Sequence, residues 1–292
     1  SLVLAHMCTV RKATTCARLV LQDNPANCAA VTDAHLSQLI GLMSEGSARY
    51  AWYLDVLLEL TRGLDRGNST VPLSILRLFL AKPNYLLILF PGKAGRERRA
   101  RQLATKSGVH GTIPPTSMVA FHHALVQLLA QLSFGFHNEV EMLIQSIMPL
   151  DELCEHICDH FCPHAVRASF LVLLKETYTI TQLKVAALAI SPSVWQVITL
   201  LVAELRTLCE VMGGYGDVED AEQAVRQLEF SHRGPCFFEA GIDFALNFLH
   251  KHLSLSDTPR ENWEVLNSFE RVTAKLLKLI EKRPFETNPR MI

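Results

Sequence analysis

The residues with the most apparent chemistry form an alternating run of cysteine and histidine at positions 154–164. It contains six groups able to bind zinc: Cys154, His156, Cys158, His160, Cys162 and His164. Zinc requires four ligands that converge tetrahedrally. On a helix, residues two apart point in nearly opposite directions, whereas residues four apart share a face. Two ligands from one helix, completed by Cys162 or His164 beyond a turn, would therefore be needed to build a site.

The alternative for this run is structural. Zinc motifs normally draw their ligand pairs from separate segments, and this run is a single segment. We therefore expect the cysteines to face a core and the histidines to face solvent or an interface. We predict no metal; Cys154, Cys158, Cys162 and His164 are the candidates that a metal site would use.

A basic run lies in the segment GKAGRERRARQLATKSG. Its candidate anion-binding residues are Lys93, Arg96, Arg98, Arg99 and Arg101. Clustered arginines can grip phosphate or carboxylate through paired hydrogen bonds. An anionic headgroup or an acidic protein segment fits better than nucleic acid, because no aromatic side chains are interleaved to stack on bases. A solvated helix in a linker is the favoured alternative, since charge runs are commonly exposed.

Other polar features do not indicate catalysis. His122 and His123 lie in an apolar segment with no acid or nucleophile beside them, so we expect one core and one boundary histidine. The acidic cluster at 217–222 lacks the spacing of a calcium-binding loop. The glycines at 213–216 follow a helix pattern instead of joining a strand to a helix, so they do not form a phosphate loop. We predict that the chain is not an enzyme and needs no cofactor.

The elements that position these residues are helices. Apolar residues recur at helical spacing through 118–178, and one broad stripe comprises Met118, Phe121, Leu125, Leu128, Leu129 and Leu132. A helix that is apolar around most of its circumference must be covered on both sides. No run alternates as a strand would. We predict an all-α fold, an armadillo/HEAT-like α-solenoid of stacked helix pairs forming a single segment over 1–292, with a flexible linker at 91–115.

Turn signals and caps divide the chain into helices, with boundaries good to about 2–4 residues. The predicted helices are 2–21, 33–45, 48–62, 71–81, 95–106, 117–134, 138–147, 150–159, 164–178, 181–190, 193–212, 218–229, 236–253 and 259–282.

The composition limits the class of protein. Of 292 residues 49% are hydrophobic, and the net charge of -1 with a pI near 6.8 argues against a general nucleic-acid binder. The eight cysteines sit in apolar helical patterns, as reduced, buried thiols do. The apolar segment Val185–Ala203 is cut at Ser191-Pro192, which leaves each half shorter than the roughly 20 residues of a membrane span. We expect no membrane span, and we expect an internal segment of a larger chain.

Several short patterns resemble one known family in their order and spacing. They are Leu19–Met43, Arg49 with Tyr53–Leu57, Arg77-Leu78 with Lys82-Pro83, Arg98–Ala104, and Leu150-Asp151 with Pro163–Phe170. Together they are similar to the RIH (ryanodine and inositol trisphosphate receptor homology) domain of the intracellular calcium-release channels. The inositol trisphosphate receptor branch fits better than the ryanodine receptor branch. The Cys/His run is not a feature of that family.

This resemblance implies a function. The chain would be a cytosolic, armadillo-like segment of a ligand-gated calcium channel in the endoplasmic reticulum membrane or an equivalent store membrane, relaying ligand-induced movement towards the pore. Its partners would be other domains of the same channel chain and neighbouring subunits of a tetramer. The family's ligand-contacting residues fall before the matched region, so no ligand-binding residue is carried over. The alternative is a free-standing armadillo-like protein-interaction scaffold.

Overall fold

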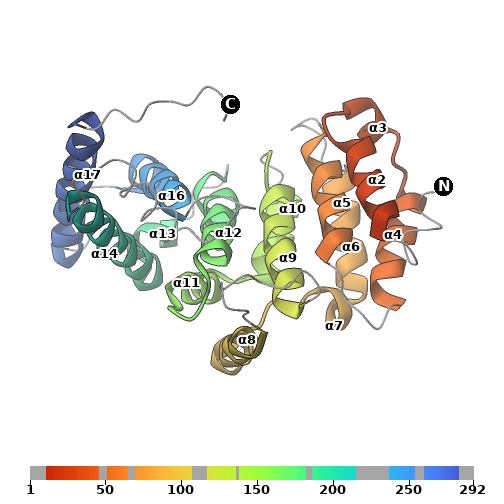
Figure 1. The fold of residues 1–292 in the computed structure, drawn as a ribbon, viewed down its shortest axis with the longest axis horizontal. Helices are drawn as coiled ribbons and strands as arrows, with labels where there is room; N and C mark the ends of the chain where they lie inside the picture. The colour runs from red at the N-terminus through yellow and green to blue at the C-terminus, as the bar shows by residue number, and fades with distance from the viewer. Residues whose placement is uncertain are drawn as a thin grey trace.

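The protein is built from helices stacked along one axis. The computed structural model describes residues 11–45, 51–64, 70–106, 117–135, 138–181, 186–214, 237–253 and 260–282. Within these ranges every regular element is helical and no strand occurs, which confirms the all-α class. Successive helices lie side by side from α2 at one end to α17 at the other (Figure 1).

The first third of the chain forms six helices. They are α2 (Arg11–Leu21), α3 (Pro25–Ala29), α4 (Asp33–Glu45), α5 (Ala51–Arg62), α6 (Thr70–Ala81) and α7 (Pro83–Leu86). The sequence analysis missed the two shortest, α3 and α7. Each has proline at its start, and Asn24 caps α3 by accepting a hydrogen bond from the backbone N–H of Asn27 at 3.1 Å. An Asn-Pro pair that opens a helix is a recognisable N-terminal signal.

The middle third contains the longest apolar segment. Its helices are α8 (Gly92–Lys106), α9 (Met118–Leu132), α10 (Asn138–Ile147), α11 (Leu150–Cys158) and α12 (His164–Leu174). Their boundaries lie close to those predicted, because caps mark the starts. Ser117 accepts a hydrogen bond from the N–H of Ala120 at 3.0 Å, while Pro149 and Pro163 occupy the N-cap positions of α11 and α12.

The last third continues the stack. It comprises a π-helical turn η1 (Lys175–Thr179), α13 (Ala186–Ile190), α14 (Pro192–Gly214), α16 (Phe237–His252), a short 3-10 turn η2 (Arg260–Asn262) and α17 (Trp263–Lys282). The break at Ser191-Pro192 lies where the sequence predicted it. Among the described residues, no helix has both the length and the apolar character that crossing a membrane requires. The helix predicted at 218–229 lies outside the described residues.

The core is one continuous cluster that runs the length of the molecule. Helices α2, α5, α9, α12 and α16 pack in succession, α4, α6 and α10 form a row beside them, and α11 and α14 connect α12 to α17. Buried apolar side chains from Leu21 in α2 to Leu276 in α17 belong to this one cluster. The armadillo/HEAT repeat stays a prediction, since helices as different as α11, with 9 residues, and α14, with 23, do not form a regular unit.

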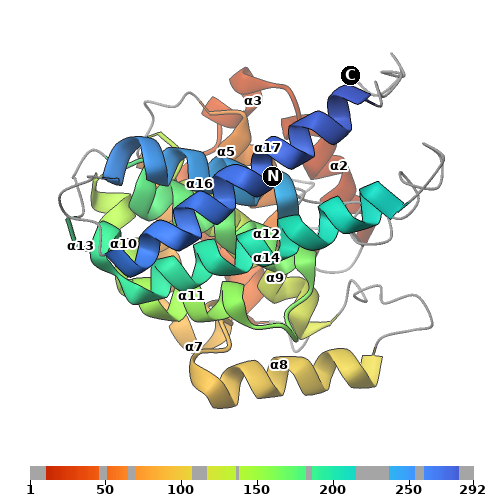
Figure 2. The ribbon, with the colours of Figure 1, turned by 90° about the vertical axis from the view of Figure 1, so that its left-hand side faces the viewer.

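Helix α8 lies apart from this stack. Figure 2 shows it running along one edge of the molecule, below α11. The helix predicted at 95–106 forms here as part of a 15-residue helix over residues 92–106, which is held against the stack, and the flexible linker over 91–115 stays a prediction. Residues 107–115 lie outside the described part of the chain. The polar contacts that hold α8 were not visible in its sequence and are described below.

The buried stripes lead to a prediction about stability. Leu54, Leu128 and Phe170 are each completely buried, so replacing any one by alanine should lower the unfolding free energy by roughly 2–5 kcal/mol through cavity formation. Met142 is 56% exposed, and Met142→Ala is the matched control, expected to stay within about 0.5 kcal/mol of the parent. Urea unfolding followed by circular dichroism measures these differences. If all three core variants unfolded like the control, the assignment of these positions to the core would be wrong.

Candidate functional site

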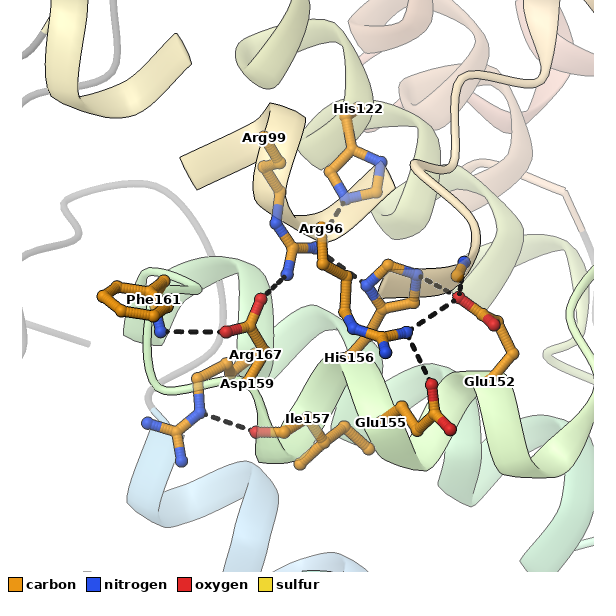
Figure 3. A network of polar contacts seen from close by, with 11 residues as sticks. Arg96, Arg99, His122, Glu152, Glu155, His156, Ile157, Asp159, Phe161 and Arg167 are labelled. Carbon is orange, nitrogen blue, oxygen red and sulfur yellow. Dashed lines mark hydrogen bonds and ion pairs between the residues drawn. The ribbon is translucent and has the colours of Figure 1, made fainter. Parts of the chain in front are cut away.

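A completely buried arginine joins α8 to the rest of the protein. The side chain of Arg99 has no solvent exposure, although it belongs to the most basic segment of the chain. One Nη atom lies 2.7 Å from Oδ2 of Asp159, and the other lies 2.9 Å from Nδ1 of His156 and 3.4 Å from Nε2 of His122 (Figure 3). A buried guanidinium requires such compensation, because removing its charge from water is costly. Arg99 therefore fixes α8 against α9 and the end of α11.

The two histidines around Arg99 are held neutral. Nδ1 of His122 lies 2.8 Å from the carbonyl oxygen of Ile88 and must donate to it, which leaves Nε2 as an acceptor facing Arg99. His156 accepts from Arg99 through Nδ1, so its proton is on Nε2. Burial, and then the positive charge of Arg99, lowers the pKa of His122 to about 3 and that of His156 to about 2. Both rings thus serve Arg99 as hydrogen-bond acceptors.

A second arginine of α8 binds the outer side of the same region. Arg96 lies 2.6 Å from a carboxylate oxygen of Glu155 and 3.3 Å from one of Glu152. The same oxygen of Glu152 accepts a hydrogen bond from the backbone N–H of Gly92 at 2.8 Å, at the start of α8. A carboxylate at a helix N-terminus is favoured by the helix dipole. Nε2 of His156 is also 3.2 Å from Glu152, within electrostatic range but misaligned for a hydrogen bond.

A third arginine holds α11 from the opposite side. Arg167 of α12 is 3% exposed; its Nε donates to the carbonyl oxygen of Ile157 at 2.8 Å, and one Nη donates to Glu204 of α14 at 3.2 Å. Its guanidinium lies 4.5 Å from the ring centre of Phe237 in α16. Arg99 and Arg167 therefore flank the end of α11 and the turn after it (Figure 3). The α11–α12 turn is fixed by charge from both sides.

Aromatic packing completes the cluster. The ring of His156 stacks on Phe170 at 4.7 Å with an interplanar angle of 6°, and His122 meets Phe90 edge-on at 5.1 Å. Arg99, His122 and His156 are each completely buried. The arrangement is suited to joining helices, because Arg99 bonds both imidazole rings and all three side chains lie away from solvent.

The predicted anion-binding residues divide between two faces of α8. Lys93, Arg98 and Arg101 lie exposed on the outer face, whereas Arg96 and Arg99 point inward to acidic and imidazole groups. Arg98 also lies over the ring of Phe90, at 5.5 Å from its centre. The five residues therefore do not form one anion-binding cluster. The acidic groups that two of them bind belong to this chain.

The predicted metal candidates do not come together. Across the described residues, no group of three or more histidine, cysteine, aspartate or glutamate side chains is arranged to hold a metal ion. Burial raises the pKa of Cys154 above its usual range and that of Cys162 to about 12, so both thiols are protonated in this environment. His164 stacks on Phe237 at 5.1 Å. Cys154 and Cys162 are buried in the core, as expected, and His160 is exposed, but His156 is completely buried and does not face solvent as expected.

The histidine pair at 122–123 also divides as predicted. His122 is completely buried and has hydrogen-bond partners on both nitrogens, while His123 lies at the boundary with its Nε2 3.0 Å from Oγ of Ser169. Burial lowers the pKa of His123 to about 4. The partner of His122 was not predicted from the sequence, because Arg99 lies in a basic run that was expected to be exposed. The signal for it was the spacing of Gly92, Gly95 and Arg99, which places two glycines and one arginine on a single face of α8.

Comparisons with known proteins identify no family for this chain. No protein-family model matches it, and no curated protein matches it.

The buried arginine predicts unequal effects of two acidic residues. Asp159→Ala should lower the unfolding free energy by about 3–5 kcal/mol, because Arg99 would remain buried without its counter-charge. Glu155→Ala removes an ion pair whose acid is 53% exposed, and is expected to cost no more than about 1 kcal/mol. Chemical unfolding of both variants measures the contrast. Equal effects would contradict the burial of Arg99.

The lowered histidine pKa values predict acid sensitivity. Between about pH 6.5 and pH 4, the unfolded chain binds protons at His122, His123 and His156 that the folded chain does not, so stability falls as pH decreases. Each histidine contributes a slope of up to about 1.4 kcal/mol per pH unit. His122→Gln should remove one such slope, whereas the control variant Met142→Ala, which changes no titratable group, should leave the pH profile like that of the parent. Unfolding at a series of pH values tests this, and an unchanged slope in His122→Gln would exclude a buried neutral His122.

Proposed function

We propose that this chain is a rigid helical scaffold that acts by presenting surfaces or transmitting displacement, and not by catalysis. The observation that supports this most directly is the single apolar core from α2 to α17. A continuous close-packed core transmits displacement, because side chains in contact cannot be compressed or separated cheaply. The buried polar groups of the Arg99 cluster serve the same purpose, since they join helices instead of facing a substrate.

Polar contacts at η1 reinforce the connection between the two halves of the stack. Lys175 lies 2.6 Å from Asp243 of α16, and Nε2 of His252 donates to the carbonyl oxygen of Thr179 at 2.9 Å. The hydroxyl of Tyr178 donates to the carbonyl oxygen of Met148 at 3.0 Å. These bonds join η1 to α16 on one side and to the end of α10 on the other. They oppose independent movement of the two halves.

The more specific proposal is that the scaffold is a cytosolic segment of an inositol trisphosphate receptor-like calcium-release channel. Its support is the ordered resemblance of the short patterns in the sequence, including Leu150-Asp151 and Pro163–Phe170. In that setting the stack would relay ligand-induced movement from preceding domains to later ones. The alternative is a free-standing interaction scaffold. The flanking sequence discriminates, because a channel requires β-trefoil domains before this segment and membrane spans of about 20 apolar residues after it.

The rigid-scaffold proposal predicts a fixed distance between the two ends of the stack. Spin labels placed at Gln38 in α4 and Glu270 in α17, both exposed, should give one narrow distance distribution by pulsed electron paramagnetic resonance. The labels are best attached through a genetically encoded ketone, because the chain contains eight cysteines. A label pair at Gln196 and Thr207 within α14 gives the width expected of a rigid reference. A distribution between the ends that is broad or has two maxima, beside a narrow reference, would contradict the proposal.

A further inference from the structure

Helix α8 is attached to the stack by charge instead of apolar packing. None of the described side chains of α8, at 92–103, belongs to the hydrophobic core or to the partly buried apolar side chains packed on it. Its outer face carries the exposed residues Lys93, Glu97, Arg98 and Arg101. Its inner face contacts α11 through Arg96 and Arg99. An element without a share in the core has the low local stability of segments that move.

The connection into α8 is tightly constrained. Phe90 adopts a φ of 52°, a left-handed conformation that aromatic residues rarely take, and Gly92 has a φ of 65°. A Cβ atom at Gly95 would lie 2.4 Å from the carbonyl carbon and oxygen of Phe90. The docked position of α8 therefore requires an unfavourable backbone conformation at Phe90. When α8 leaves this position, Phe90 is free to adopt a more favourable conformation.

The surface beneath α8 is formed without α8. Helix α11 packs against α12 and α14, and α12 packs against α9, all through the continuous core. Glu152, Glu155 and Asp159 would keep their places on this framework if α8 left. Together with the acceptor nitrogens of His122 and His156 they would form an exposed acidic surface, which we call the α11 acidic site.

We propose that the α11 acidic site is a docking site for an arginine-bearing helix of a protein partner, and that α8 occupies it in cis as an autoinhibitory contact. The site is shown with a ligand already in place, because Arg96 and Arg99 fill it (Figure 3). This inference rests on the proposed scaffold function for its biological role and names one surface through which that function operates. Displacement of α8 by the partner exchanges one arginine pair for another.

The geometry specifies the chemistry of the partner. The arginines are three residues apart, so they lie on one face of a helix, the first binding Glu152 and Glu155 and the second binding Asp159, His156 and His122. Guanidinium is required at the second position, since its planar fork donates at once to a carboxylate and to imidazole nitrogens, which a lysine ammonium cannot match. The residue before the first arginine must be glycine, as Gly95 is, because a Cβ atom there would collide with the backbone of Phe90.

The test measures whether α8, supplied as a separate peptide, binds the α11 acidic site of the full chain. The probe is a fluorescent synthetic peptide with the sequence of residues 92–106, and the protein is the full chain carrying Arg96→Ala and Arg99→Ala, which weakens the cis contact but leaves the α11 acidic site intact. Fluorescence anisotropy should show saturable binding to this variant and at least tenfold weaker binding to the wild-type chain. Placing glutamine at both arginine positions of the peptide should reduce binding at least tenfold. Adding Glu152→Gln and Asp159→Asn to the protein should do the same.

A second variant that weakens the docking of α8 is needed in case the chain carrying Arg96→Ala and Arg99→Ala does not fold. Gly95→Ala leaves every charge in place and forces α8 away from Phe90, and it should also bind the peptide more tightly than wild type. No peptide binding by either folded variant would overturn the proposal. A dimer that the peptide dissociates, seen by light scattering, would mean that two copies of the chain exchange α8. That result would overturn the proposal that the partner is a different protein. If the peptide does not bind but the distance distribution between the two ends of the stack is narrow, the α11 acidic site is rejected and the rigid-scaffold proposal is retained.

Discussion

The constraint on which most of this structure depends is the burial of α9 and α12. Both helices are apolar over nearly their whole circumference, so each must be covered on every side by other helices. Helices α5 and α16 cover them along the stack, and α11 packs on α12 and in turn on α14. Because each covering helix also has an apolar face to bury, the core extends in both directions as far as α2 and α17. The length of the molecule follows from this one requirement.

The Arg99 cluster adds a different kind of constraint. Apolar packing tolerates small shifts of one helix along another, whereas a buried guanidinium bound to Asp159 and His156 accepts one register only. The histidines make the cluster possible, because their lowered pKa values keep them neutral beside a positive charge. The same dependence on charge makes α8 separable. It is held by contacts that another arginine-bearing segment can reproduce, on a framework that does not need α8.

The sequence predicted the helices well and the polar cluster poorly, for physical reasons. The bounds of α4 and α10 were predicted to the residue, since periodicity and turn signals are local. The broad stripe in α9 predicted its burial, and the Ser191-Pro192 break was visible directly. The burial of Arg99 was not predictable in this way, because its partners His156 and Asp159 lie 57 and 60 residues away. A charge run normally marks a solvated face, and only the glycines at 92 and 95 indicated a close approach. The Cys/His run likewise suggested metal chemistry, whereas His156 accepts from an arginine and Cys154 is a core residue.

The central claim is that a single apolar core forms the scaffold and that α8 is attached to it separately by charge. Native-state hydrogen exchange, resolved by residue and measured at low and high salt, tests it most directly. The account predicts that amides of α9 and α12 share the highest opening free energy with little salt dependence. It predicts that amides of α8 open at a lower free energy, which falls further as salt is added. Equal protection of α8 and α9, unaffected by salt, would contradict it.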